Sequence, residues 1–218
     1  MNIITKKEQA FAEIEKFKII DESSKNSLEE FVDLLIEENK KVNLIGKSTT
    51  EDVWNRHIVD SIQLFKFIKN ENHKFADLGC GAGLPGLVLS IAGIKEIHLI
   101  EKSFRKCEFL RLARKISKNK ITVHNRKIEE INQFPFDCIV SRALASLEKL
   151  LEYSLKLLNK DGYCLFLKGK NFESELQDAK KIFNFDYILH QSITSNVSYI
   201  VEISNITSKN SAPNPLSP

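Results

Sequence analysis

Hydrophobic residues recur every three or four positions through the first 70 residues, which is the spacing of amphipathic helices. The pattern predicts helices over residues 7–18 and 28–36, and a third helix that begins near Thr49. Each of these helices has an apolar stripe that must be covered by other parts of the protein. We therefore expect residues 1–70 to form a helical N-terminal extension packed on the core.

From Lys74 onward, short apolar strands alternate with helical segments, an order typical of a parallel sheet with helices on both faces. The last two strands are joined by a short polar link, so they are predicted to form an antiparallel hairpin. The predicted strands are 75–78, 97–100, 121–124, 137–141, 163–168, 187–193 and 199–203. Residues 71–206 thus predict one Rossmann-like α/β domain with a mostly parallel, seven-stranded sheet. Residues 207–218, rich in proline, serine and asparagine, are expected to form a disordered tail.

The composition suits a folded domain, with 42% hydrophobic and 28% charged residues. No apolar run approaches the ~18 residues of a membrane span, and no signal-peptide pattern opens the chain. We therefore expect a cytoplasmic protein with no membrane partner. The four cysteines lack CxxC spacing, so no metal or redox site is expected and they are interpreted as reduced, buried residues. Cys80, inside a glycine-rich turn, is the one expected to be partly accessible.

The net charge of +3 is unevenly distributed along the chain. Between Glu101 and Lys127 there are ten Lys/Arg residues and two acids, a local excess of +8. Arg105 and Lys106 lie at the start of a predicted helix, where positive charge opposes the helix dipole. An anionic partner such as nucleic-acid phosphate explains these two residues better than helix stability does. For the basic residues further along the helix, a solvated surface is an equally good explanation.

A glycine-rich turn over residues 79–86 links the first predicted strand to its helix and holds half of the eight glycines in the chain. Residues 81–86 match G-x-G-x-x-G, the dinucleotide-binding fingerprint. The register is wrong, however, because Gly79 directly follows the strand and Leu84 then stands where the third glycine belongs. Asp77 at the strand tip disfavours a pyrophosphate and suits an ammonium group, such as the methionine end of S-adenosylmethionine.

Glu101, at the tip of the second strand, is placed to accept hydrogen bonds from ribose hydroxyls. Either NAD or S-adenosylmethionine offers such hydroxyls, so this acid does not discriminate between them. An NAD-dependent oxidoreductase therefore remains an alternative function. A non-catalytic RNA-binding module is a second alternative, but it explains only the basic segment. The residues expected to bind the cofactor are Asp77, Gly79, Gly81, Gly83 and Glu101.

Two further groups of polar residues are candidates for a substrate site. Arg56, His57 and Asp60 are three and four positions apart, on one face of a predicted helix. Asp60 is expected either to orient His57 or to hold Arg56 towards the ligand, or simply to form a surface ion pair. Arg142 ends the fourth strand, where doubly wound transferases place residues beside the reacting group. Lys168, at the tip of the fifth strand, follows the same logic with less force.

Taken together, these segments resemble the RsmG (GidB) family, bacterial methyltransferases that act on small-subunit ribosomal RNA. The segments that carry the resemblance are Asn43-Leu44, Arg56-His57-Ile58-Val59-Asp60-Ser61, residues 77–86, residues 105–110, Ser141-Arg142-Ala143, Ala145-Ser146 and Leu167-Lys168-Gly169. The resemblance implies a class I S-adenosylmethionine-dependent methyltransferase fold with an N-terminal helical extension. It also implies methyl transfer to N7 of a guanine in 16S rRNA.

The resemblance also assigns roles to residues. Leu84 lines the cofactor loop with Gly79, and the pair Ile128-Glu129 meets the adenine end. Arg142 lies at the cofactor. Guanine N7 has an exposed lone pair and needs no general base, so Arg142 is expected to position the base. RNA contacts are expected from Arg56, His57, Arg105, Lys106 and Lys168. The expected partner is 16S rRNA within the small ribosomal subunit or an assembly intermediate, bound by a monomer without metal.

Overall fold

The computed structural model describes residues 3–17, 20–132 and 135–209, and it forms a seven-stranded sheet in the order β3-β2-β1-β4-β5-β7-β6. Strands β1 to β5 pair in parallel, and β7 is antiparallel to both β5 and β6. The predicted fold class, a mostly parallel sheet with an antiparallel hairpin at one edge, is confirmed. The strands are β1 (Lys74–Leu78), β2 (Glu96–Glu101), β3 (Lys120–Asn125), β4 (Phe136–Arg142), β5 (Leu158–Lys168), β6 (Phe183–Gln191) and β7 (Tyr199–Ser208).

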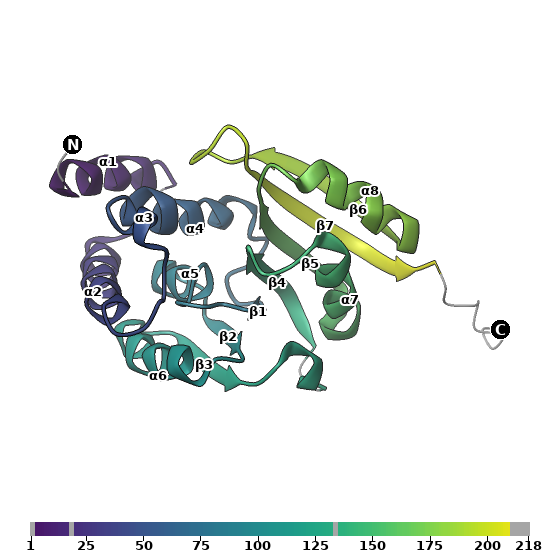
Figure 1. Cartoon of the computed structure of the whole chain (residues 1–218), viewed down its shortest axis with the longest axis horizontal. Helices are drawn as coiled ribbons and strands as arrows, with labels where there is room; N and C mark the ends of the chain where they lie inside the picture. The colour runs from purple at the N-terminus through teal and green to yellow at the C-terminus, as the bar shows by residue number, and fades with distance from the viewer. Residues whose placement is uncertain (1–2, 18–19, 133–134, 210–218) are drawn as a thin grey trace.

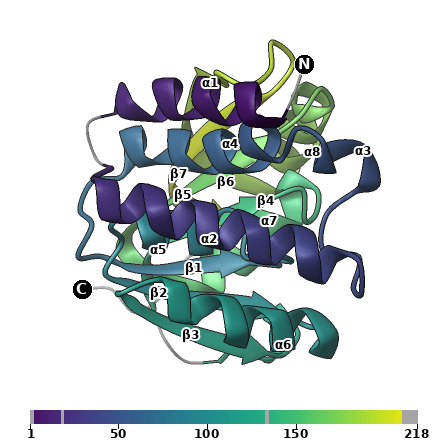
Figure 2. The same ribbon diagram turned by 90° about the vertical axis from the view of Figure 1, so that its left-hand side faces the viewer.

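Helices cover both faces of this sheet (Figure 1). They are α1 (Ile3–Glu15), α2 (Glu22–Asn39), α3 (Lys47–Thr50), η1 (Trp54–Val59), α4 (Asp60–Ile62), η2 (Gln63–Phe67), α5 (Gly86–Ala92), α6 (Phe104–Ala113), η3 (Arg114–Ile116), η4 (Ile128–Glu130), α7 (Leu147–Leu157) and α8 (Phe172–Ile182). Helix α2 packs against α5 and α6, and Figure 2 shows it crossing the molecule between α1 and α6. Helices α7 and α8 pack against each other and against the strands on the opposite face.

Two apolar clusters, one on each face of the sheet, form the core. Successive residues of β1 face opposite sides, so Phe75 belongs to one cluster and Ala76 to the other. The cluster that contains Phe75 also contains Phe31 and Ile58 of the N-terminal segment, and all three side chains are fully buried. The helices that precede β1 thus share a core with the sheet. Within the described residues, no helix has the length and apolar character needed to cross a membrane.

The third predicted helix is interrupted in the structure. Helix α3 has four residues, and the chain then forms a π-helix over Trp54–Val59 before a short α-turn and a 3-10 turn. Within this segment Arg56 is exposed and His57 is buried, although both line the same pocket as Asp60.

Each strand extends beyond its predicted range, and the differences are largest for β5, β6 and β7. Strand β6 covers Phe183–Gln191, where residues 187–193 were predicted. Residues 158–162, which precede the predicted range of β5, belong to this strand, and a register shift against β4 between Phe136 and Cys138 absorbs the extra residues. Strand β7 continues to Ser208 through its pairing with β6, so Thr207 and Ser208 are not part of a tail. The rest of the predicted disordered tail, residues 210–218, lies outside the described residues.

Candidate active site

The glycine-rich turn lies at the carboxyl end of β1 and leads into α5. Gly79 and Gly81 have φ values of 63° and 56°, a region that favours glycine. A Cβ atom on Gly81 would meet nothing within 4 Å, so the surface beside this residue is open to a ligand. A Cβ atom on Gly79 would instead clash with the side chain of Leu144, which follows β4. The turn thus offers exposed backbone at Gly81 and is covered by Leu144 at Gly79.

Asp77, at the end of β1, is fully buried. Its Oδ2 accepts a hydrogen bond from the Gly86 amide at 2.8 Å, whereas its Oδ1 is buried without a partner. Burial raises the pKa of this carboxyl to about 7, despite the opposing effects of the Gly86 hydrogen bond and of Arg142. An unpaired carboxylate oxygen beside an open glycine turn fits the ammonium group of a methionine moiety, as the sequence predicts.

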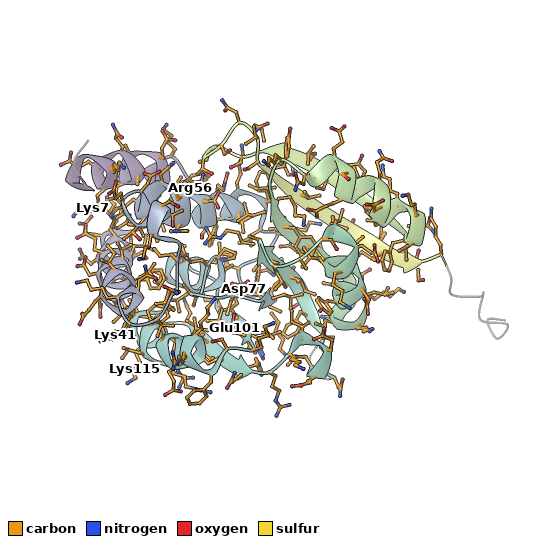
Figure 3. All side chains as sticks on the ribbon, viewed as in Figure 1. Lys7, Lys41, Arg56, Asp77, Glu101 and Lys115 are labelled. Atoms are coloured by element: carbon orange, nitrogen blue, oxygen red, sulfur yellow. The ribbon has the colours of Figure 1, made fainter. Side chains whose placement is uncertain are left out.

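Glu101, at the end of β2, lies next to the same turn, and Figure 3 shows it close to Asp77. Its Oε2 accepts from the Gly81 amide at 3.1 Å and its Oε1 accepts from the Ser103 amide at 2.7 Å. Each carboxylate oxygen has a second lone pair, so ribose hydroxyls can still donate to it. Glu101 therefore fits a ribose and also holds the Gly81 backbone in place.

A pocket of about 320 Å³ lies where the helices before β1 meet the ends of β4 and β5 and the β6–β7 link. Its walls come from four separate stretches of the chain. The lining residues are Arg56, His57, Asp60, Arg142, Ala143, Leu167, Lys168, Gly169, Thr194, Ser195 and Ser198. The structure thus brings together four of the residues that the sequence assigned to RNA or base contact, namely Arg56, His57, Arg142 and Lys168.

Arg142 is held in this pocket by two polar contacts. Its Nη1 donates to the Arg56 carbonyl oxygen at 3.0 Å and lies 3.4 Å from Asp60 Oδ2. Asp60 is itself fixed, because its Oδ1 accepts from Thr194 Oγ1 at 2.6 Å and from Gln63 Nε2 at 2.9 Å. Asp60 therefore orients Arg142 and does not pair with His57 or Arg56 through its side chain.

His57 is a neutral residue in this environment. Its side chain is buried, and burial together with Arg142 and Arg56 lowers its pKa to about 3. The Thr49 hydroxyl donates to the Gly46 carbonyl oxygen, so Thr49 Oγ1 is left to accept from His57 Nε2 at 2.9 Å. The proton of the neutral ring therefore lies on Nε2. The prediction that His57 contacts RNA is not supported by this burial, because a neutral, enclosed ring does not attract phosphate.

Lys168 is also buried, with 7% of its surface exposed. Its Nζ forms an ion pair with Glu175 Oε2 at 2.5 Å and donates to the Ala145 carbonyl oxygen at 2.8 Å. These contacts use the ammonium group within the protein. The geometry therefore gives Lys168 internal partners in place of the RNA phosphate that the sequence suggested.

Arg105 and Lys106 lie at the start of α6, with Arg105 exposed and Lys106 half-buried. Further along, Leu112 is 44% exposed. The α-helix ends at Ala113 and tightens into the 3-10 turn η3. We refer to Lys102, Arg105, Lys106 and Lys115, which are exposed or half-buried on or next to α6, as the basic rim.

The residues assigned to the adenine end lie on η4, after β3. Ile128 is buried in the core cluster beneath α7, and Glu129 is exposed and accepts from the Tyr153 hydroxyl at 2.6 Å. Their contact with adenine stays a prediction. Cys80, expected to be partly accessible, is 2% exposed, and burial raises the pKa of its thiol. All four cysteines are free and buried.

Several site residues had no clear signal in the sequence. Thr194 and Glu175 become partners of Asp60 and Lys168 only through the tertiary fold. Ala143 adopts φ 50°, a left-handed conformation that is rare for a residue with a side chain.

In the part of the chain that the structure describes, no group of three or more His, Cys, Asp or Glu residues has the arrangement of a metal site.

Two solved methyltransferase structures share this fold. The ribosomal protein L11 methylase from Lactobacillus delbrueckii subsp. bulgaricus matches with a TM-score of 0.57 and 18% identity, over 68% of this chain and 78% of that chain. M. jannaschii TYW2, solved in complex with AdoMet, matches with a TM-score of 0.52 and 17% identity, over 67% of this chain and 74% of that chain. At these identities the matches show the fold alone.

Sequence comparison is more specific. Residues 24–203 match the family GidB, rRNA small subunit methyltransferase G. Ribosomal RNA small subunit methyltransferase G of Rickettsia prowazekii (strain Madrid E) is 43% identical over 182 residues, which cover 83% of this chain and 93% of that protein. The protein of the same name from Rickettsia felis (strain ATCC VR-1525 / URRWXCal2) is 42% identical with the same coverage. These matches set aside the oxidoreductase and the non-catalytic RNA-binding module. The chain belongs to the rRNA small subunit methyltransferase G (GidB) family, as its motifs predict.

Proposed function

We propose that this protein transfers a methyl group from S-adenosylmethionine to N7 of a guanine in 16S rRNA. The observation that carries the proposal is the buried, unpaired Oδ1 of Asp77 beside the open turn at Gly81, next to a pocket that contains Arg142. Family membership supports the class of substrate. S-adenosylmethionine supplies an electrophilic methyl group, and the roles below belong to the residues of this chain.

Asp77 and Glu101 hold the two polar ends of the cofactor. Asp77 Oδ1 accepts from the ammonium group, and the Glu101 carboxylate accepts from the ribose hydroxyls. Both acids are fixed by backbone amides of Gly86, Gly81 and Ser103. Because these contacts exist before binding, little reorganisation is needed when the cofactor enters.

Arg142 holds the guanine so that its N7 faces the methyl group. The side chain is fixed by the Arg56 carbonyl oxygen and by Asp60, so its remaining guanidinium donors have a defined direction. Guanine N7 attacks without losing a proton, so no residue acts as a general base. Orientation of the two reactants then supplies the rate enhancement, and well-oriented pairs gain up to about 7–11 kcal/mol.

The basic rim binds RNA phosphates around the target base. Arg105 and Lys106 lie at the carboxyl edge of the sheet, on the element that follows Glu101. The exposed positive charge attracts the RNA, while the pocket selects the base. We also propose that the enzyme acts as a monomer, because one chain supplies all the residues that line the pocket. We propose further that it acts without metal and in the cytoplasm, where bacterial ribosomes are assembled.

The test is transfer of labelled methyl from S-adenosylmethionine to small ribosomal subunits that lack the modification, followed by mapping of the methylated base. We expect label on N7 of a single guanine in 16S rRNA. Naked 16S rRNA and an assembly intermediate serve as parallel substrates and identify the form that is recognised. Label on another base, or on protein, would contradict the proposal.

A further inference from the structure

We propose that Lys168 and Glu175 form a clamp that fixes the loop between β4 and α7, so that Lys168 is a positioning residue for methyl transfer. The loop, residues 143–146, follows Arg142 at the end of β4 and carries Leu144 over the glycine turn. This inference rests on the proposed function, and it gives Lys168 a role inside the protein in place of an RNA contact.

The clamp joins three parts of the chain that are distant in sequence. Lys168 at the end of β5 donates to the Ala145 carbonyl oxygen at 2.8 Å and pairs with Glu175 Oε2 at 2.5 Å. The same Glu175 oxygen, on α8, accepts from the Leu147 amide at 2.8 Å. One ion pair therefore holds the backbone on both sides of Ser146, where the loop turns into α7.

Burial makes this pair sensitive to the loss of either partner. The Lys168 side chain is 6% exposed and that of Glu175 is 26% exposed. A buried ion pair contributes less to stability than an apolar pair of equal size, but removal of one partner leaves an uncompensated charge. Such a pair fixes geometry more than it adds stability, which suits a loop that must hold one conformation.

The loop needs such support because its backbone is strained. Ala143 has φ 50°, a conformation that L residues rarely adopt and that persists only when its surroundings hold it. Upstream of Ala143, the Arg142 side chain is anchored by the Arg56 carbonyl oxygen and Asp60. Downstream, Lys168 and Glu175 provide the second anchor. With one anchor released, Ala143 can relax, and Arg142 and Leu144 then move relative to the glycine turn.

Lys168→Met tests the clamp, because methionine keeps an unbranched apolar side chain and removes the ammonium group. We expect kcat for methyl transfer at saturating cofactor and RNA to fall at least tenfold. We expect the salt dependence of RNA affinity to stay unchanged, since no phosphate contact is lost. The salt slope is the slope of the logarithm of RNA affinity against the logarithm of salt concentration. If its magnitude falls by about one while kcat is unchanged, Lys168 is an RNA contact and the proposal is wrong.

A matched control comes from α8 itself. Lys181 is 72% exposed and pairs with Asp178, so Lys181→Met removes a lysine charge without touching the loop. This variant should keep the kcat of the parent. Equal loss of kcat in both variants would show that net charge matters and the clamp does not.

Glu175 provides a second, graded test that does not depend on Lys168→Met being folded. Glu175→Gln keeps an acceptor for the Leu147 amide, whereas Glu175→Ala removes it. We expect kcat to be highest in the parent, lower in Glu175→Gln and lowest in Glu175→Ala. Equal kcat in all three would overturn the proposal.

Hydrogen exchange separates the clamp from the proposed function. The Leu147 amide should exchange faster in Glu175→Ala than in the parent, whether or not RNA is methylated. If the parent transfers no methyl to small subunits but this difference is found, the proposed function fails and the clamp stands. An unchanged Leu147 exchange rate would show that the clamp does not hold the loop.

Discussion

The interior of the site and the basic rim use charged residues in opposite ways. In the interior, Asp77, Arg142 and Lys168 are largely or fully buried, and each has a specific partner within the protein. On the rim, Arg105 and Lys115 are exposed to solvent. Our proposal therefore gives the same residue types two functions: interior charges define the geometry, and rim charges produce a long-range field for RNA.

The difference predicts how substitutions divide between turnover and binding. A change in the interior moves atoms relative to the methyl group, so it lowers kcat or cofactor affinity. A change on the rim removes a screened charge, so it lowers RNA affinity in a salt-dependent way. For an interior variant, an effect on RNA affinity alone would contradict this division. For a rim variant, an effect on kcat alone would contradict it.

The largest effect is expected from Arg142→Ala. The base loses its positioning contact, and a displacement of about 1 Å can cost roughly 100-fold in rate. The measurement is kcat at saturating cofactor and small subunits, with the salt slope of RNA affinity as a companion. Turnover equal to that of the parent would refute the role given to Arg142.

The next effect is expected from Asp77→Asn, which keeps an acceptor for the Gly86 amide and removes the negative charge. Cofactor affinity should fall about tenfold, as for loss of a charge-assisted hydrogen bond. Titration calorimetry or a binding-induced rise in the melting midpoint measures this loss. Asp77→Asn with unchanged affinity would show that the ammonium group is bound elsewhere.

Asp77 also predicts a pH dependence of cofactor binding. Its pKa is raised to about 7 by burial, so the carboxyl is protonated at lower pH and cannot pair with an ammonium group. Cofactor affinity should therefore rise from about pH 5.5 to about 7.5 in the parent and stay flat in Asp77→Asn. Without cofactor, the folded state holds the extra proton between about pH 4 and the pKa near 7, so this carboxyl makes unfolding easier as pH rises through that window.

A smaller effect is expected from the double variant Arg105→Gln, Lys106→Gln. RNA affinity at low salt should fall several-fold, and the salt slope should decrease by up to about 2. At saturating RNA, kcat should match the parent. Lys181→Gln, on α8 and outside the basic rim, is the control and should leave the slope unchanged. An effect on kcat alone would place the start of α6 at the reacting atoms.

The smallest effect is expected from His57→Gln. The salt dependence of RNA affinity should be the same in this variant as in the parent. With a pKa near 3, His57 carries no charge at neutral pH and cannot release a counterion from RNA. A slope that decreases by about one would show that the ring is charged against a phosphate. This outcome would mean that His57 acts like the RNA-binding charges of the basic rim and not like the interior residues of the site.

Local patterns were sufficient to predict much of the fold. The order of the seven strands, the glycine turn and the strand-tip acids Asp77 and Glu101 depend on short sequence segments, and the structure has them in the predicted order, although β5, β6 and β7 are longer than predicted. The π-helix over Trp54–Val59 could not be predicted in this way, because a single extra residue per turn has no hydrophobic signature.

Partners that are distant in the sequence explain the other differences. Lys168 looks like a strand-tip cation until Glu175 and Ala145 approach it in the folded chain. Asp60 meets Thr194 across 134 positions, a contact that no local pattern reports. Both residues line the same pocket, and the contacts of each depend on a partner that only the tertiary structure supplies.

The pocket also has a consequence for the timing of the protein's own synthesis. Its walls come from residues 56–60, 142–143, 167–169 and 194–198, and the last stretch joins the two strands that end the described chain. A nascent chain that lacks the β6–β7 hairpin has the glycine turn but neither Thr194 nor a closed pocket. Because synthesis proceeds from the N-terminus at about 5–20 residues per second, the cofactor turn can form while translation continues. The pocket can form only after the hairpin has left the translating ribosome, so the proposed binding site for the base is completed last during synthesis.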